Sequence, residues 1–347
     1  MYYIIIALLL LIGKKFERKW TCILSTLTLV LFAGLRANNV GADTVQYLHS
    51  FEYCSIYSSI NSALYDRSLD ENAIEIGYYI LEYLCHLIMS YNSFKLLCAS
   101  LTIIPVGYIL YKYSNHPTVS FLLFYMLPIY TLLSMSAIRQ GIAFGFVLLA
   151  MDMCFQKRWK MYVTWMLIAL LFHNSVAILI PLYILNYIDY KRRYNIYIFI
   201  VFGVVAYYST RIFLFLNTYS RIDYEVGDAG GIGMLLFLCL LMVVSFSVPE
   251  FELQKGLDKF LIYFLVATIC FWFIGMNLAA IFRLAAYTEF FMSLYVSNTL
   301  SKIPNTANRN LIIILIMFGT FLMMNKLVLR ESTNEVNTYY PYYFNWE

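Results

Sequence analysis

Long apolar stretches separated by short polar loops make up most of this chain. Several are shorter than the ~20 residues that cross a bilayer unaided, but tilting, burial among neighbouring helices or local bilayer thinning accommodates short spans. The pattern therefore predicts an all-α fold, a polytopic transmembrane helix bundle with about twelve crossings and one domain over residues 1–347. The predicted spans are 1–13, 20–35, 94–111, 118–135, 137–155, 161–172, 175–188, 194–216, 232–249, 259–276, 279–299 and 309–326.

One further apolar segment, residues 74–91, carries Glu75, Glu82 and His86, and it can be read as a crossing or as a helix that dips in and returns. Loops rich in Lys and Arg stay in the cytoplasm. The three strongest basic clusters can all be cytoplasmic only if this segment does not cross: 14–19, 156–160 and 189–193. We therefore predict a partly inserted helix within an outer loop at 36–92.

The resulting topology places both termini and a second outer loop, 217–231, on the outer side. The cytoplasmic loops then hold 15 of the 24 Lys and Arg residues, and most acids lie outside. Composition agrees, since 62% of residues are hydrophobic and 13% are charged, about half the usual charged share. The seven cysteines lack close pairing, so we expect neither a zinc site nor a disulfide framework, and we expect no cofactor and no nucleic-acid partner.

Arg139 lies about one turn into the predicted span 137–155. An Arg at membrane depth costs a few kcal/mol unless it is paired or faces a watery cavity. Gly141 and Gly145 form a small-xxx-small pattern that lets another helix approach closely. The alternative is that Arg139 snorkels to the outer headgroups, but the close packing and the neighbouring Gln140 favour a cavity-facing ligand.

Two other predicted spans carry polar groups near their outer ends. Arg283 is embedded in 279–299, and Glu289 lies six residues on, nearly two turns away, so the two are not ideal partners. Snorkelling or a structural ion pair is the alternative to ligand binding. His173 lies between two spans, before Asn174, a good N-cap for the next helix. It is either part of a plain turn or a group that transfers protons near neutral pH.

The start of the long outer loop joins an Arg, an Asp and a Tyr. Arg36 ends the second span, Gly41 permits a tight turn, and Asp43 can cap a helix that runs through Tyr47. An ordinary capped loop helix is the alternative. Arg binds phosphate through two parallel hydrogen bonds and stays charged, so arginines converging outside suit a diphosphate. No metal-ligand motif accompanies them, and arginines alone can stabilise a departing diphosphate.

Five segments resemble, in family order, the signatures of EpsG-type proteins: NVGADTVQYLHSFE, SAIRQGIAFGFVLLA, LLFHNSVAILIPLYIL, IFRLAAYTEFF and the tail YPYYFNW. Ala42 departs from the pattern, which often has Thr. EpsG proteins are similar to Wzy-type polymerases, which join oligosaccharide repeat units carried on undecaprenyl diphosphate. The resemblance implies such a glycosyltransferase at the outer face of the bacterial cytoplasmic membrane. Its expected partners are the lipid-linked units, the growing polysaccharide, membrane lipid, a chain-length regulator and the pathway's flippase.

On this hypothesis, Arg139 and Arg283, with Arg36, hold the donor diphosphate. Asp43 or His173 takes the proton of the acceptor hydroxyl. The remaining predicted site residues position sugar or phosphate: Tyr47, Gln140 and Asn174. A flippase of lipid-linked oligosaccharide is one alternative, although no internal repeat is visible and the embedded cations gather near one face. Another outer-face polysaccharide ligase or transferase is the second alternative.

Overall fold

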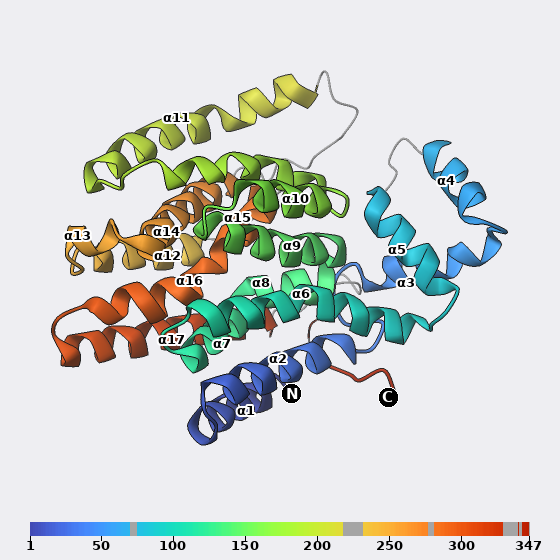
Figure 1. Cartoon of the computed structure of the whole chain (residues 1–347), viewed down its shortest axis with the longest axis horizontal. Coiled ribbons are helices and arrows are strands. Elements are labelled where there is room, and N and C mark those ends of the chain that lie inside the picture. Colours follow the sequence, from blue (N-terminus) through green and yellow to red (C-terminus); the bar gives the residue numbers. More distant parts are fainter. Residues whose placement is uncertain (70–74, 218–231, 277–280, 329–338, 340–341, 347) are drawn as a thin grey trace. The chain divides into compact units, whose positions relative to one another are not determined.

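Helices account for nearly all of the regular structure in the computed structural model, which describes residues 1–69, 75–217, 232–276, 281–328, 339 and 342–346. Within these residues there are seventeen α-helices (Figure 1). The described residues contain one isolated antiparallel bridge, Arg36 with Phe344, and no longer strand pairing. The all-α prediction is confirmed.

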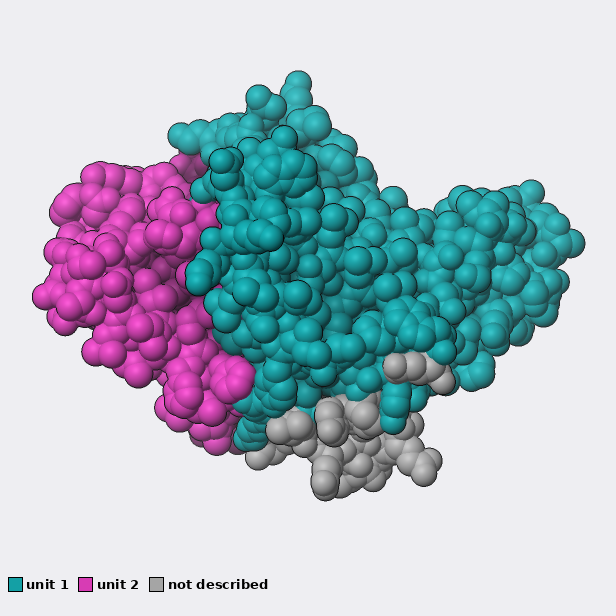
Figure 2. Space-filling model, turned by 90° about the horizontal axis from the view of Figure 1, so that it is seen from below, with its two compact units in different colours: residues 1–113, 124–183, 324–347 teal, residues 114–123, 184–323 magenta. Residues whose placement is uncertain are grey.

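The chain divides into two compact units, shown in different colours in Figure 2. Unit 1 comprises residues 1–113, 124–183 and 324–347, and unit 2 comprises 114–123 and 184–323. The first ten helices are α1 (Tyr2–Lys15), α2 (Arg18–Gly34), α3 (Thr44–Tyr53), α4 (Ile60–Leu69), α5 (Ile76–His86), α6 (Tyr91–Tyr113), α7 (Pro117–Met126), α8 (Pro128–Thr131), α9 (Ile138–Phe155) and α10 (Trp159–Leu170). A 3₁₀ helix, Asn174–Asn186, precedes α11 (Arg192–Asn217), α12 (Ile232–Ser245), α13 (Glu250–Leu253), α14 (Gly256–Gly275), α15 (Phe282–Glu289), α16 (Phe291–Leu294) and α17 (Thr306–Val328).

The apolar runs found in the sequence are helical along most of their described length. Four helices are long and apolar enough to cross a membrane, namely α6, α9, α14 and α17. A fifth candidate is the pair Pro117–Met126 and Pro128–Ser136, which is bent by 68°. These apolar helices indicate a multi-pass membrane protein.

The ambiguous segment 74–91 contains α5, which has 11 residues. At 1.5 Å per residue, α5 is only about 16 Å long, whereas the hydrocarbon core is about 30 Å thick. The predicted helix is therefore present and is too short to cross by itself. The other predicted outer loop, 217–231, lies outside the described residues except for Asn217 at the end of α11.

Close packing around α9 positions the residues of the candidate site. A side-chain carbon added at Gly145 would lie 2.2 Å from the Leu101 carbonyl oxygen of α6. One added at Gly141 would lie 1.9 Å from the Leu133 carbonyl oxygen. The close helix approach predicted from these two glycines is confirmed.

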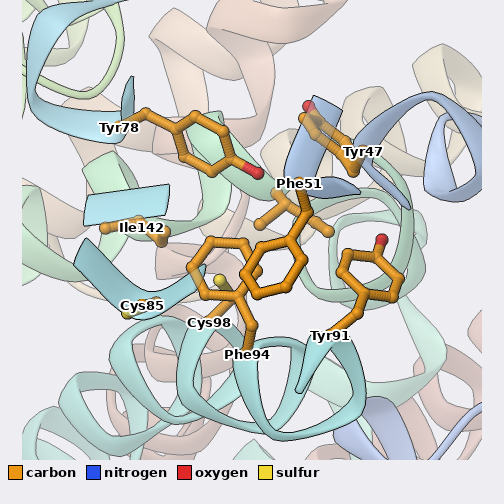
Figure 3. Packing of buried hydrophobic residues seen from close by; sticks show 9 residues of the cluster. Tyr47, Phe51, Tyr78, Cys85, Tyr91, Phe94, Cys98 and Ile142 are labelled. Atoms are coloured by element: carbon orange, nitrogen blue, oxygen red, sulfur yellow. The ribbon is translucent and has the colours of Figure 1, made fainter. Parts of the chain in front are cut away.

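A buried aromatic cluster joins α3, α5, α6 and α9 (Figure 3). The rings of Phe51 and Phe94 stack with centroids 5.1 Å apart. The ring of Tyr78 lies 5.7 Å from that of Tyr47. Tyr91 donates a hydrogen bond from its hydroxyl to the Thr44 carbonyl oxygen at 3.0 Å. This cluster therefore fixes the start of α3 against the first turns of α5, α6 and α9.

Candidate functional site

Glu75, the residue before α5, joins two distant segments of unit 1 through its carboxylate. Its Oε2 accepts a hydrogen bond from Arg139 Nη1 at 2.6 Å. Its Oε1 lies 2.8 Å from His173 Nδ1 and also accepts a longer bond, 3.4 Å, from the Asn174 backbone N–H. The start of α5, the start of α9 and the turn after α10 thus meet at one carboxylate.

The first turn of α5 lies directly against the end of α10 because residue 77 is a glycine. The Gly77 N–H donates to the Leu171 carbonyl oxygen at 2.7 Å. A side-chain carbon on Gly77 would lie 2.7 Å from that same oxygen, closer than side-chain carbons are found. After Leu171, the His173 N–H still donates to the Ala169 carbonyl oxygen at 3.1 Å, so the turn holding the imidazole continues from α10.

Arg139 remains accessible at the start of α9. Its side chain is 30% exposed, although its Nε is buried and has no hydrogen-bond partner among the described residues. The guanidinium also lies within hydrogen-bonding reach of the Tyr47 side chain. Glu75 and Tyr47 therefore orient a cation that can still contact a ligand.

Burial alone would raise the pKa of Glu75, but the His173 hydrogen bond and the Arg139 charge outweigh it and lower that pKa to about 2. The carboxylate is ionised at physiological pH and acts as an acceptor. His173 therefore presents a proton on Nδ1 toward Glu75, which leaves Nε2 as the acceptor nitrogen of the neutral ring. An imidazole oriented by a carboxylate is the arrangement of a general base.

Asp43 is the N-cap residue of α3, and its side chain makes no capping hydrogen bond. It is half-buried and interacts electrostatically with Tyr47, one turn further on. Gln140 is buried at the start of α9, whereas Asn174 is exposed beside His173. Within unit 1, Arg139 thus lies beside Tyr47 and shares Glu75 with His173, whereas Asp43 interacts with Tyr47.

Arg36 is predicted as a phosphate ligand, but its guanidinium is held by the backbone of its own unit. It is 1% exposed and donates to the carbonyl oxygens of Ala33 at 2.6 Å, Val40 at 3.1 Å and Met135 at 3.0 Å. Lys95 is equally buried and donates to the Arg36 carbonyl oxygen at 2.5 Å. This geometry gives Arg36 a structural role in the loop that carries Asp43.

The C-terminal tail fastens to the same loop. The Ala37 N–H donates to the Tyr343 carbonyl oxygen at 2.9 Å, and the Asn345 N–H donates to the Leu35 carbonyl oxygen at 3.0 Å. The Tyr342 ring stacks on Phe32 with centroids 4.4 Å apart. The aromatic ending noted in the sequence therefore helps to shape the loop before α3.

A protein-family comparison matches residues 19–344 to the model of the EpsG family. The chain belongs to the EpsG family. This family is associated with exopolysaccharide biosynthesis. Comparisons with curated proteins and with solved structures gave no match.

Arg283 of this EpsG-family protein belongs to unit 2. It occupies the first turn of α15 and is exposed. Glu289, six residues after Arg283, is buried and accepts a hydrogen bond from Trp272 Nε1 at 3.2 Å. The predicted role of Arg283 at the diphosphate therefore stays a prediction from the sequence.

Sequence reasoning did not select Glu75 or Glu82 as site residues. Both are acidic residues within the apolar segment 74–91, and this unusual placement is the sequence feature that could have identified them. Glu82 is fully buried, and burial raises its pKa to about 7 although Ser50 and Tyr78 donate to its carboxylate at 2.8 and 3.3 Å. No group of three or more His, Cys, Asp or Glu side chains in the described part of the chain could hold a metal ion.

Proposed function

We propose that this EpsG-family protein polymerises undecaprenyl-diphosphate-linked oligosaccharide repeat units into a surface polysaccharide. The observation that carries this proposal is the contact of the Glu75 carboxylate with both His173 and Arg139. It pairs an oriented base with an accessible cation, the two groups that transfer of a sugar from a diphosphate requires. Family membership supports the pathway in which such a reaction belongs.

In the proposed reaction, an acceptor hydroxyl oxygen attacks the anomeric carbon of the donor sugar. The bond from that carbon to the diphosphate oxygen breaks, and undecaprenyl diphosphate leaves with the bonding electrons. His173 Nε2 accepts the hydroxyl proton, and ionised Glu75 stabilises the imidazolium that forms. Arg139 stabilises the negative charge that develops on the departing diphosphate.

His173 is the better of the two candidate bases because a carboxylate fixes its ring. Asp43 remains the alternative base and otherwise positions the acceptor together with Tyr47. Of the other predicted contacts, Asn174 is the exposed one beside the base. Gln140 and Arg36 are buried, so we propose that they support the site from behind.

The proposal includes about twelve crossings, both termini outside and one integral domain in the bacterial cytoplasmic membrane. The site then lies on the outer face, where flipped lipid-linked units arrive. A chain-length regulator and the flippase of the same pathway are proposed partners.

The deciding experiment incubates the purified protein with lipid-linked repeat units and resolves the products by size. Polymerase activity gives a ladder of longer lipid-linked oligomers and releases undecaprenyl diphosphate. Movement of the units between leaflets without new glycosidic bonds would identify a flippase instead. Transfer of single units to a different acceptor would identify a ligase.

A further inference from the structure

An apolar groove of about 380 Å³ runs between α2 and α6 on unit 1. These antiparallel helices lie side by side in Figure 1. Ile23 and Leu27 line the groove from α2, and Ile104 and Tyr108 line it from α6. All four side chains are exposed in the isolated chain. In a multi-pass membrane protein, such walls face lipid.

The groove has a closed floor because the two helices touch there. A side-chain carbon at Gly107 of α6 would lie 2.0 Å from Thr26 Oγ1 of α2, so no gap remains between the backbones. Large side chains flank this contact on both sides and form the walls. The groove therefore runs along the helix pair, and its volume is within the usual range for small-molecule sites, about 300–1,000 Å³.

Positive charge gathers at one end of the groove. Lys19 lines it directly, and Arg18 donates through Nε and Nη2 to the Tyr111 carbonyl oxygen, at 3.1 and 2.5 Å. Lys14 and Lys15 end the preceding helix, and all four cations are exposed. Arg18 thus ties the basic segment to the last turns of α6, where the groove ends.

This basic end is remote from the candidate site along the same helix pair. The Arg36–Lys95 contact joins the end of α2 to the start of α6, whereas Arg18 and Tyr111 join the start of α2 to the end of α6. Seventeen helical residues separate these ends along α2, about 26 Å at 1.5 Å per residue. A lipid whose headgroup lies at Lys19 therefore occupies the leaflet opposite to the site and is not the donor.

We propose that the groove binds an anionic phospholipid, with an acyl chain between α2 and α6 and the phosphate at Lys19. The apolar walls supply the chain contact, and basic residues beside a membrane helix attract anionic headgroups. Charge complementarity selects this occupant over a zwitterionic lipid. The inference is independent of the proposed polymerase reaction.

The test titrates the purified full-length protein in detergent with phosphatidylglycerol or phosphatidylcholine and counts bound lipids by native mass spectrometry. Wild-type protein should retain phosphatidylglycerol more tightly than phosphatidylcholine. Lys19→Gln should weaken phosphatidylglycerol binding about fivefold, the effect of one cation at a membrane surface. Leu27→Trp should fill the groove and weaken binding of both lipids.

Matched controls come from α10, which carries exposed residues of the same kinds. Lys160→Gln and Leu167→Trp should bind both lipids as wild type does, and Lys19→Arg should keep the preference for phosphatidylglycerol. Lipid binding is measured only on the monodisperse fraction of each variant from gel filtration, which excludes unfolded protein. Equal affinity of wild type for the two phospholipids, unchanged binding by Lys19→Gln, or displacement of phosphatidylglycerol by equimolar undecaprenyl phosphate would overturn the proposal.

Discussion

The Glu75 carboxylate contacts both His173 and Arg139, so one side chain just before a short helix orients two candidate site residues. It holds the His173 ring in one orientation and neutralises part of the Arg139 charge. The sequence pointed to Arg139 and His173 individually, because an Arg at membrane depth and a His beside a helix cap are unusual in apolar surroundings. It did not reveal their common partner, because a carboxylate 64 residues before Arg139 and 98 before His173 is found only when the chain is folded.

Replacing His173 with Ala should lower the polymerisation rate by about 10²–10⁴-fold, the usual contribution of a general base. The rate of oligomer elongation by purified protein measures this effect. Asp43→Asn is the matched comparison and should retain most of the activity. The reverse ranking, with Asp43→Asn inactive and His173→Ala active, would assign the base to Asp43.

Arg139→Lys should reduce elongation on the order of 10²-fold, comparable to removing one donor at a developing negative charge. Lys keeps the charge but lacks the planar fork that contacts Glu75 and diphosphate together. Product length on a gel and donor affinity are the two measurements. Lys157→Arg, at an exposed position after α9, is a neutral control. Full-length polymer from Arg139→Ala would refute the donor assignment.

Glu75→Gln should destabilise the protein at neutral pH. The difference in stability between the variant and wild type should become smaller as the pH falls. The pKa of Glu75 in the folded protein, about 2, lies below the ordinary value of 4.5 for a glutamate side chain. The stabilisation is therefore complete above about pH 4.5 and is lost as pH falls toward 2. Melting temperatures in detergent between about pH 3 and 7 test this.

Glu82→Gln is the control, because the effect of pH on the stability of this variant relative to wild type should have the opposite sign. Because its folded pKa is raised to about 7, wild type should lose stability relative to this variant as pH rises from about 4.5 through 7. Parallel pH profiles for the two variants would contradict both assignments.

Short elements carry the site, namely the start of α5, the start of α9 and the turn after α10. The spans follow from hydrophobicity, so their approximate positions could be predicted. The helix in 74–91 and the turn at His173 could be predicted too, but not the contact of α5 with Leu171 or the pairing of the tail with residues 35–37, because these join distant segments. Gly77 shows the difficulty, since its lack of a side chain matters only when Leu171 lies against it.

Gly77→Ala should destabilise the protein by about 1–3 kcal/mol, the usual cost of overpacking, and should separate Glu75 from His173. Thermal unfolding and elongation activity should therefore fall together. Gly203→Ala is the matched control on α11, where nothing lies within 4 Å of the added carbon. It should be neutral or stabilising by up to about 1 kcal/mol. A fully active Gly77→Ala protein would show that the close approach is dispensable.

For the whole molecule, the hydrophobic pattern and the charge bias predict an orientation in the membrane. Composition and periodicity sufficed for the all-α class, whereas sidedness rests on where basic loops lie. Helix length alone identifies four candidate spans among the described residues, or five with the bent pair. The remaining crossings of the proposed topology would require short helices to cross with the help of neighbouring helices or a locally thinner bilayer.

A reporter fused after residue 60 should respond as an extracytoplasmic fusion, because the proposed topology keeps 36–92 outside. Fusions after residues 158 and 192, within basic loops, serve as cytoplasmic controls. A cytoplasmic signal at residue 60 would mean that 74–91 crosses and that a flanking basic cluster faces outward.

The pairing of the tail with the Arg36 loop also has a consequence for biosynthesis. Phe32 and Tyr342 are 310 residues apart in the chain. At about 5–20 residues per second, a ribosome needs on the order of 15–60 s to make the intervening segment. During that interval the loop before α3 lacks its partner. A nascent chain can thus insert its early helices long before that loop can take its final shape, which delays the maturation of the site until residue 342 has been synthesised.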